Sequence, residues 1–395
     1  MSELHLNSVL VEQLKGRGYL SSQAVEDAFR AVPRHHFLPG VPLETAYGDC
    51  DQPVPTRWEA GIAVSSSSAP SIMAVMLEQL DVRPGHRVLE IGAGTGYNAC
   101  LLSRMTVPGG RVTSVDIEEA LVIAARAHSA DAEASGVEFV CADGAHGWPV
   151  GAPYARIVLT AGSADVSPAW IEQLEPGGRL LLPLELTPGY SKSVAFERRD
   201  GHLHSVSLRD CGFMPLRGVL APLDIMPRAV RRVDTGVVLS ATQPEALWRR
   251  LREQTPLHHN LGVNVSPMHL WHLRLWLSLW APDAACCVQA QGDAASREDL
   301  PTLFSPQRSP LARISAGLES DRGACLLHRG TDGLEVWEYG DGADLVARLR
   351  TLAARPQPPG ESISIRAYPG RQAIEASKTR AVLPRRWSTL VVSWS

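Results

Sequence analysis

The chain has 395 residues, of which 45% are hydrophobic, 20% charged and 6% aromatic, a composition typical of a globular protein with two domains of ordinary size. Its net charge of −4 gives no electrostatic reason to expect a nucleic-acid or membrane surface. The N-terminus lacks the cationic start and apolar core of a secretory signal, and the most apolar run, at 267–282, is shorter than the roughly 20 residues of a membrane span. We therefore expect a cytoplasmic protein with neither a nucleic-acid nor a membrane partner.

Helical periodicity dominates the first eighty residues. Apolar residues recur at helical spacing in three segments, where we predict helices: 7–18, 23–32 and 71–80. Ser21 and Ser22 are candidate N-caps of the second helix, and the prolines of the following PRHHFLPG segment end it. The pattern changes after the third helix.

From residue 87 onward, short apolar runs alternate with helical stretches. We predict strands over 87–91, 111–116, 137–141 and 155–160, and helices over 97–105 and 118–134. A helix, a Gly-Gly turn and a strand follow at 168–184, and then a hairpin with Asp200-Gly201 at its turn. This alternation is typical of βαβ units around a mainly parallel sheet, so we expect an α/β fold.

The pattern becomes less regular after about residue 220. The segment 221–232 resembles a linker. Beyond it we predict helices over 243–254, 268–280 and 343–354, and strands over 334–338, 361–367 and 388–394. We therefore predict two domains: residues 1–220 form a catalytic domain, and residues 221–395 form a C-terminal α+β accessory domain that helps to recognise the substrate.

The strongest chemical signal is the run VLEIGAGTGY at 88–97, a predicted strand that leads into glycines at the start of a helix. Glycines let the backbone approach a ligand closely, and the helix N-terminus offers unpaired N–H groups. The next predicted strand ends at Asp116, whose carboxylate can accept hydrogen bonds from both hydroxyls of a ribose. The expected ligand is a cofactor that contains a nucleoside.

Two classes of cofactor use this arrangement. Dinucleotide sites have a GxGxxG spacing, whereas here a GxGxG spacing follows Glu90, which favours S-adenosylmethionine over a nicotinamide cofactor. A purely structural glycine turn, with Asp116 as an N-cap, is the alternative. The occurrence of Glu90, the glycines, Asp116 and Asp143-Gly144 at successive strand ends argues against that alternative.

The glycine spacing resembles the first motif of class I S-adenosylmethionine-dependent methyltransferases. In that family the acid two residues before the first glycine and the loop hold the amino-acid end of the cofactor, and Ala142-Asp143-Gly144 looks like the adenine-contacting element. The resemblance implies a Rossmann-like fold with S-adenosylmethionine as cofactor. It implies the following cofactor-binding residues: Ser65, Ser67, Glu90, Gly92, Ala93, Gly94, Gly96, Asp116, Ile117, Asp143 and Gly144.

Seven segments within roughly residues 10–190 resemble, in order, protein-L-isoaspartate O-methyltransferases: AVEDAFRAVPRHHFLP, ETAYGD, SSAPSIMAVMLEQL, VLEIGAGTGYNACLLSRM, DGAHGW, APYARIVLTAG and LEPGGRLLLPL. That family methylates a peptide carboxylate, so the resemblance implies a carboxyl O-methyltransferase with a peptide substrate. A carboxylate with a pKa of about 4 is already a nucleophile at pH 7 and needs no general base. It needs placement in line with the methyl group, in a site that excludes water.

The serine segment AVSSSSAPS at 63–71 has a counterpart in the same family. There a Thr/Ser-x-Ser-x-Pro segment lies over the cofactor and carries the hydroxyl nearest the reacting carboxylate, which implies that Ser66 and Ser68 are the catalytic residues and that Ser68 orients the acceptor. Ser65 and Ser67 are expected to line the channel for cofactor and substrate. The alternative is a serine-rich turn that caps the helix after Pro70.

Two departures from the repair enzymes stand out. Ser67 and Ser71 occupy positions that are usually apolar and aromatic or histidine, which implies a smaller, more polar pocket, and the chain continues for about 175 residues after the hairpin. This long form is similar to isoaspartate-methyltransferase-like enzymes of lanthipeptide biosynthesis. Those enzymes methylate an aspartate side chain of a modified, ribosomally made precursor peptide, and the ester then closes to a succinimide that hydrolyses to isoaspartate or aspartate.

Two alternatives remain. General isoaspartate repair is the first, and a peptide-binding module that keeps the fold without the chemistry is the second. The histidines suggest a metal, but none has an acid or cysteine cluster at ligand spacing, and we predict no metal site. The tryptophans of the C-terminal half fit a hydrophobic core better than a peptide groove.

Overall fold

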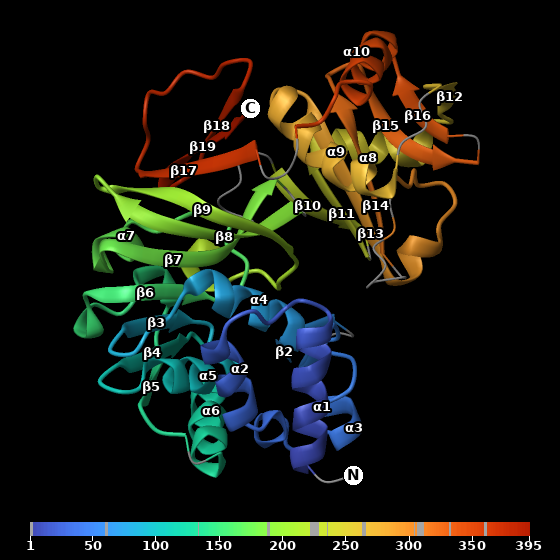
Figure 1. Cartoon of the computed structure of the whole chain (residues 1–395). Coiled ribbons are helices and arrows are strands. Elements are labelled where there is room, and N and C mark those ends of the chain that lie inside the picture. Colours follow the sequence, from blue (N-terminus) through green and yellow to red (C-terminus); the bar gives the residue numbers. More distant parts are fainter. Residues whose placement is uncertain are drawn as a thin grey trace.

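A computed structural model describes residues 3–59, 62–132, 134–187, 190–221, 229–234, 236–262, 266–303, 305, 312–331, 333–358 and 362–395. Its strands form a ten-stranded sheet, a seven-stranded sheet and a two-stranded hairpin. The two large sheets lie in different parts of the molecule, with the blue N-terminal helices beside the parallel half of the ten-stranded sheet (Figure 1).

The N-terminal region is helical, as predicted. It contains α1 (Glu3–Gly16), α2 (Gln23–Ala31), the 3₁₀ helix η1 (Arg34–Phe37) and the short α3 (Leu43–Ala46). The Ser22 hydroxyl accepts a hydrogen bond from the Val25 backbone N–H, which confirms Ser22 as the N-cap of α2. Apolar residues from α1, α2 and η1 pack into one core with those of the later helices at 70–80 and 97–106.

The first sheet has a parallel centre that follows the predicted βαβ alternation. Its parallel strands are β3 (Arg87–Ile91), β4 (Arg111–Asp116), β5 (Val137–Cys141), β6 (Tyr154–Leu159) and β7 (Leu174–Thr187). Helix α4 (Pro70–Leu80) precedes β3, and the helices between the strands are α5 (Tyr97–Thr106), α6 (Glu119–Asp131) and α7 (Pro168–Gln173). Because β4 and β6 flank β3 on opposite sides, the strand order reverses at β3, and the crevice at such a point is where open α/β sheets bind ligands.

An antiparallel hairpin extends the first sheet beyond β7. It consists of β8 (Tyr190–Arg199) and β9 (His202–Cys211). Asp200 and Gly201 at its turn both have positive φ, at 50° and 77°, as a tight two-residue hairpin turn requires. The predicted turn is therefore confirmed.

The serine segment forms a strand that the sequence did not predict. Residues Ile62–Ser67 are strand β2, which pairs antiparallel with β1 (Val54–Glu59), and the register places Ser65 opposite Arg57 and Ser67 opposite Val54. Strand propensity is low for serine, so the segment takes its extended form from pairing with β1 and not from its own composition.

A second sheet is wholly antiparallel and has the order β10-β11-β13-β14-β15-β16-β12. Its strands are β10 (Ala229–Asp234), β11 (Val237–Ala241), β12 (Leu257–Asn260), β13 (Ala285–Gln291), β14 (Ala312–Glu319), β15 (Gly323–Gly330) and β16 (Gly333–Gly340). Helices α8 (Pro244–Glu253), α9 (Pro267–Trp280) and α10 (Ala343–Ala353) accompany it. The predicted linker lies partly outside the described residues, at 222–228, and its last part belongs to β10.

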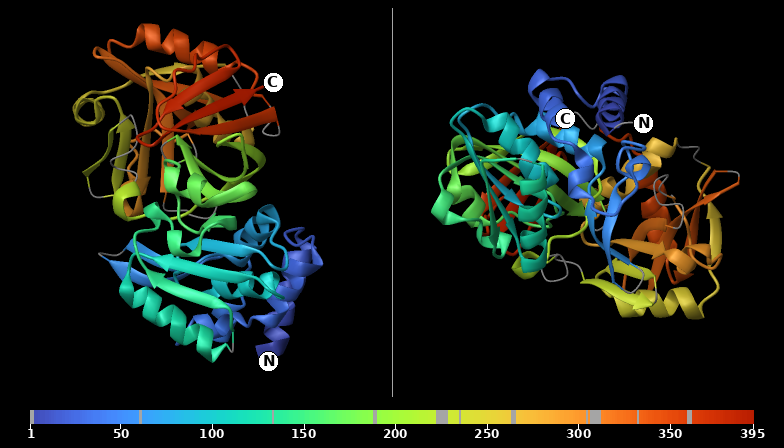
Figure 2. Two further views of the ribbon diagram at one scale, coloured as in Figure 1. Left: turned by 90° about the vertical axis from the view of Figure 1, so that its left-hand side faces the viewer. Right: turned by 90° about the horizontal axis from the view of Figure 1, so that it is seen from below.

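The last strands of the chain return to the first sheet. Strands β17 (Ile363–Pro369), β18 (Arg380–Pro384) and β19 (Ser388–Trp394) give it the order β18-β19-β17-β9-β8-β7-β6-β3-β4-β5. In Figure 1 they are the red strands beside β9, and the left view of Figure 2 shows the same neighbourhood from the side. The sheets thus divide the chain differently from the predicted boundary at 220, since residues 363–394 pair with β9 and not with the second sheet.

The tryptophans of the C-terminal half belong to the core, as predicted. Trp248, Trp276 and Trp337 are buried, and Trp271, Trp280 and Trp387 are partly buried against the same clusters. Among the described residues, no helix combines the length and the apolar character that crossing a membrane requires.

Candidate active site

A cleft opens at the carboxyl ends of β3, β4 and β6, where the strand order reverses. Its cavity volume is about 140 Å³. The following predicted site residues line it: Ser65, Ser66, Ser67, Ser68, Gly92, Ala93, Gly94, Asp116, Ile117 and Gly144. Three others, Glu90, Gly96 and Asp143, lie outside the lining.

The glycine loop after β3 forms the floor of the cleft. The backbone N–H groups of Gly92 and Ala93 donate to the Val115 carbonyl at 2.8 and 3.2 Å, which holds the loop against the end of β4. Gly92 and Gly94 both have positive φ, and a Cβ on Gly92 would lie 2.4 Å from the Thr160 hydroxyl oxygen. A Cβ on Gly94 would instead meet open space, so the loop leaves free the position where a ligand would approach.

Asp116 stands at the end of β4 beside this loop. One carboxylate oxygen accepts from the Gly94 N–H at 3.1 Å and the other from the Glu118 N–H, also at 3.1 Å. Burial raises the pKa of Asp116 above its usual value, and the backbone N–H of Gly94 works in the opposite direction. The remaining lone pairs can still accept hydrogen bonds from two neighbouring hydroxyl groups.

Glu90 lies beneath the loop. Its side chain is fully buried and accepts hydrogen bonds from Asn98 Nδ2, at 2.7 Å, and from the Ser114 hydroxyl. Burial raises the pKa of Glu90 to about 7. Of its two partners, Asn98 lines the cavity, so Glu90 is joined to the cleft wall through Asn98.

Gly96 and Asp143 make contacts that hold neighbouring segments of the protein together. A Cβ on Gly96 would lie 3.1 Å from the Cβ and the carbonyl oxygen of Ala125, so the glycine lets α5 and α6 pack closely. The Asp143 carboxylate accepts from the backbone N–H groups of Ala145, at 2.9 Å, and Val219, at 3.0 Å. Asp143 therefore ties the end of β5 to the segment after β9.

The four serines line one side of the cleft. Ser65 and Ser67 are buried, whereas Ser66 and Ser68 are half-buried. The Ser67 hydroxyl is buried and has no hydrogen-bond partner in the described part of the chain. The capping alternative is wrong, because Ala69 is the N-cap of α4 and no side chain caps that helix.

One wall of the cleft was missed by the sequence analysis. It is the segment Phe213–Arg217 after β9, whose residues all line the cavity. Two backbone hydrogen bonds join it to the loop after β6: Gly162 N donates to Met214 O at 2.8 Å, and Leu216 N donates to Gly162 O at 2.7 Å. The segment CGFMPLRG has neither helical nor strand periodicity, so only its proline and its place after the hairpin could have marked it.

An ion cluster joins three segments at the rim. The Glu118 carboxylate pairs with Arg57 from β1 on one oxygen and with Arg217 from the missed wall on the other. Glu118 is also bound through its backbone N–H to Asp116. The hairpin, the end of β4 and the wall are thus fastened together beside the cleft.

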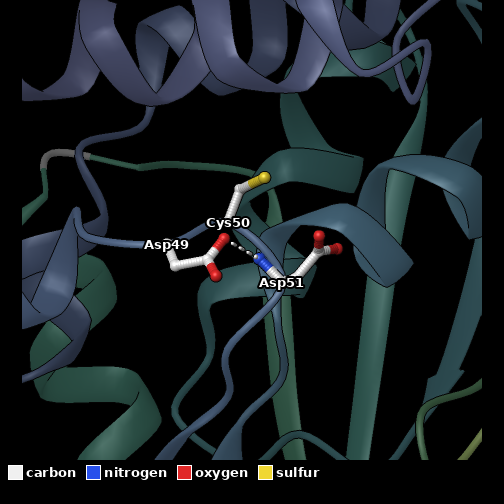
Figure 3. Close-up of side chains that lie close together, drawn as sticks. All are labelled: Asp49, Cys50 and Asp51. Atoms are coloured by element: carbon white, nitrogen blue, oxygen red, sulfur yellow. Dashed lines mark hydrogen bonds between the residues drawn. The ribbon is translucent and has the colours of Figure 1, made fainter. Parts of the chain in front are cut away.

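Asp49, Cys50 and Asp51 bring potential metal ligands within 4.8 Å of one another. Figure 3 shows the hydrogen bond from the Asp51 backbone N–H to the Asp49 carboxylate, at 3.1 Å. Both carboxylates also accept from Arg17, at 2.8 and 2.7 Å. The two acidic side chains therefore already have a cationic partner within the protein.

Comparison with known proteins gives the family. The profile of the protein-L-isoaspartate(D-aspartate) O-methyltransferase family matches residues 5–220. The protein-L-isoaspartate O-methyltransferase of Methanopyrus kandleri is 37% identical over 210 residues, which cover 53% of this chain and 90% of the relative. That of Aeropyrum pernix is 37% identical over 211 residues, covering 53% and 78%.

A solved structure named protein-L-isoaspartate O-methyltransferase resembles the fold over almost the whole chain. The similarity covers 91% of this chain and 96% of the other, with a TM-score of 0.52 and 24% sequence identity. The fold is that of a class I methyltransferase with a further C-terminal sheet, as predicted.

The cleft fits the cofactor of this family. The positive-φ glycines leave an open cradle at Gly94, and the Asp116 carboxylate lies at its edge. The predicted enzyme class and the predicted S-adenosylmethionine cofactor are confirmed by the family. The chain belongs to the protein-L-isoaspartate(D-aspartate) O-methyltransferase family, whose members are S-adenosylmethionine-dependent methyltransferases.

Proposed function

We propose that this protein transfers a methyl group from S-adenosylmethionine to the free carboxylate of an L-isoaspartyl residue in a peptide or protein. One observation carries the proposal: the half-buried Ser66 and Ser68 line the same cleft as the glycine loop and Asp116. Hydroxyl groups there can hold an acceptor carboxylate next to the cofactor. The relatives in Methanopyrus kandleri and Aeropyrum pernix, which carry the name of this activity, support the same reading.

For this reaction the protein needs mainly to place the carboxylate next to the methyl group. Bound S-adenosylmethionine supplies a methyl group on a sulfonium. One carboxylate oxygen forms the new C–O bond as the C–S bond breaks, the electron pair goes to sulfur, and no proton is transferred. Because a carboxylate with a pKa of about 4 is ionised at pH 7, the site needs hydrogen-bond donors that orient it and walls that exclude water.

The described residues suit these roles. We assign Ser68 to orienting the acceptor carboxylate, with Ser66 beside it, and Ser65 and Ser67 to lining the channel. The loop Gly92–Gly94 and Ile117 would hold the cofactor. Asp116 would accept hydrogen bonds from its ribose hydroxyls.

The test is methyl transfer to two matched linear peptides, one with an L-isoaspartyl residue and its aspartyl twin. Isoaspartate methylation predicts that only the first gains a methyl group by mass. If neither peptide is methylated and calorimetry detects no binding of S-adenosylmethionine, the proposal fails and a non-catalytic peptide-binding protein is favoured.

A second candidate is methylation of an aspartate side chain in a lanthipeptide-type precursor. One departure favours it: Ser67 and Ser71 stand where the resemblance implies apolar and aromatic or histidine residues in repair enzymes. The roughly 175 residues after the matched segment do not discriminate, because the similarity to the solved structure named protein-L-isoaspartate O-methyltransferase covers 91% of this chain. Methylation turns the carboxylate into a better electrophile, so the next backbone nitrogen can attack it, expel methanol and form a succinimide. Methyl gain or loss of water by a cyclised aspartyl peptide, without reaction of the isoaspartyl peptide, would select this candidate.

A further inference from the structure

Arg34 is the most deeply buried cation near the cleft. It begins the 3₁₀ helix η1 and is 0% exposed. Sequence analysis assigned it no role. Arginine is rarely fully buried without a partner, because removing the guanidinium from water is costly.

The Arg34 side chain holds the backbone of the serine segment. Its Nη2 donates to the carbonyl oxygen of Ser68 at 2.9 Å and to that of Ser67 at 3.3 Å. Its Nη1 lies 3.9 Å from the sulfur of Met73, and its guanidinium carbon is 5.3 Å from the centre of the Tyr97 ring. All four neighbours line the cleft, so Arg34 lies one layer behind the cavity wall.

The charge of Arg34 is not matched by a carboxylate. Burial lowers the pKa of Arg34 to about 10, which still leaves it protonated at neutral pH. Among the residues that the structure describes, Arg34 has no ion pair, and its Nε has no hydrogen-bond partner. Two carbonyl dipoles and the face of Tyr97 offset part of the cost of burying the charge. An anion bound in the cleft would offset more.

Two further buried polar groups lie in the residues around Arg34. The hydroxyls of Ser67 and Tyr97 have no hydrogen-bond partner within the described residues, and both side chains belong to the lining. Such groups need a partner, since an unsatisfied buried donor is costly. The cation and the two hydroxyls therefore belong to residues that form the cleft wall or lie directly behind it.

We propose that Arg34 is a positioning residue for the acceptor carboxylate. It fixes the Ser67–Ser68 backbone, and with it the Ser68 hydroxyl, and its positive charge makes this side of the cleft selective for an anionic acceptor. The proposal rests on the proposed function, because it takes the acceptor to be a peptide carboxylate. Arg34 acts through the serine segment and does not itself touch the reacting atoms.

The test compares wild type with Arg34→Met and Arg34→Lys. For each, calorimetry measures the binding of an isoaspartyl peptide and of its isoasparaginyl twin, which has a neutral amide in place of the carboxylate, in the presence of S-adenosylhomocysteine. The affinity for S-adenosylmethionine is measured separately. Arg30→Met is the matched control, because Arg30 pairs with Glu12 and Glu26 at the surface of α2.

We expect wild type and Arg30→Met to prefer the carboxylate peptide. In Arg34→Met this preference falls by about tenfold or more, as for loss of a charge-assisted interaction, while the affinity for S-adenosylmethionine stays within about threefold. Arg34→Lys keeps the charge but not the paired hydrogen bonds, so it retains most of the preference and loses kcat. If the role of Arg34 were merely structural, Arg34→Met would bind both peptides more weakly by the same factor.

Each other outcome is decisive. Equal weakening of both peptides in Arg34→Met, or an unchanged preference, overturns the role of Arg34 while leaving the proposed function intact. If Arg34→Met does not fold, a folded Arg34→Lys that has lost the preference overturns it as well. If wild type methylates neither an isoaspartyl nor an aspartyl peptide, the proposed function fails and the role of Arg34 fails with it.

Discussion

The hydroxyl of Ser388 donates a hydrogen bond of 2.6 Å to the buried carboxylate of Asp165, 223 residues earlier in the chain. The same carboxylate accepts from the backbone N–H groups of Val166 and Trp387, each at 2.7 Å. Asp165 lies in the loop between β6 and α7, and this loop holds the Phe213–Arg217 wall through Gly162. The last strands of the chain therefore support a wall of the cleft.

Ser388→Ala should lower both stability and activity. The substitution removes one donor from a buried carboxylate, which costs about 1–3 kcal/mol of unfolding free energy. We also expect a higher KM for the peptide, because the wall is anchored through Asp165. Urea denaturation and steady-state kinetics measure the two effects. The control is Ser364→Ala on the exposed face of β17, and equal behaviour of the two variants would contradict the coupling.

A fragment of residues 1–220 should not reach the stability of the full chain. Strands β17 and β19 bury Ile365, Leu390 and Val392 in the same core cluster as Phe196 and Leu203 of the first sheet. Without them this apolar surface and the edge of β9 meet water. We expect aggregation or a lower thermal midpoint. A fragment that unfolds cooperatively at the midpoint of the full chain would show that the predicted boundary at 220 is a folding boundary.

Glu90 should make the protein less stable as the pH rises. The pKa of Glu90 is raised by burial from 4.5 to about 7, so between these values the folded state keeps a proton that the unfolded state has released. The unfolding free energy therefore falls as the pH rises from about 4.5 to about 7, by about 3 kcal/mol. Below pH 4.5 the raised pKa does not reduce the unfolding free energy, and above about pH 7 the whole reduction is present.

The measurement is urea denaturation of wild type and Glu90→Gln at pH 5 and pH 8. Glutamine resembles the protonated acid, because its amide can donate to the Ser114 hydroxyl and accept from Asn98. We expect the two proteins to be similar at pH 5 and the variant to be more stable at pH 8. Glu44→Gln, at an exposed position on α3, controls for the loss of one negative charge. Parallel pH profiles for wild type and Glu90→Gln would refute the assignment.

The sequence predicted the parallel half of the first sheet well, because its signals are local. Apolar runs, a helix N-cap at Ser22 and the Asp200-Gly201 turn each specify their own neighbourhood. The chemical pattern at the ends of β3 and β4 is local as well. Gly92, Gly94 and Asp116 accordingly reach the cleft as predicted.

What the sequence could not predict depends on contacts between distant segments. Strand β17 joins β9 through the pairs Arg366 with His204 and Ala367 with Leu203, and nothing in 361–367 specifies that partner. Ser65–Ser67 are a strand only because β1 pairs with them. Glu90 lies outside the cleft lining, and its carboxylate accepts from Asn98 and Ser114, two contacts that the motif alone does not specify.

The ion pairs of Glu118 should strengthen the binding of S-adenosylmethionine. Glu118 fastens Arg57 of the hairpin and Arg217 of the wall beside Asp116, so Glu118→Gln loosens both. Partly exposed ion pairs are worth up to about 1 kcal/mol each, which predicts a roughly twofold to tenfold weaker affinity for S-adenosylmethionine. Calorimetry at low and high salt measures it. The affinity of wild type for S-adenosylmethionine should fall toward that of the variant as the salt concentration rises. A difference in affinity that does not depend on salt would argue against a role for the Glu118 ion pairs.

Gly94→Val and Ser68→Ala should separate cofactor binding from methyl transfer. Gly94 has φ of 51°, a backbone conformation that a β-branched residue strongly disfavours, and its new side chain would point into the open cradle. We expect Gly94→Val to abolish binding of S-adenosylmethionine. Ser68→Ala removes a half-buried hydroxyl from the serine side and leaves the loop intact, so kcat should fall about tenfold to a hundredfold while cofactor affinity changes little.

Calorimetry with S-adenosylmethionine and single-turnover methyl transfer measure the two quantities. Ser66→Ala is the matched comparison, because Ser66 is also half-buried and lines the same cleft two residues earlier in the serine segment. If the Ser68 hydroxyl orients the acceptor, its loss slows transfer more than the loss of Ser66. Equal loss of cofactor binding in Gly94→Val and Ser68→Ala would instead place Ser68 in the cofactor site, and the acceptor carboxylate would then need another donor.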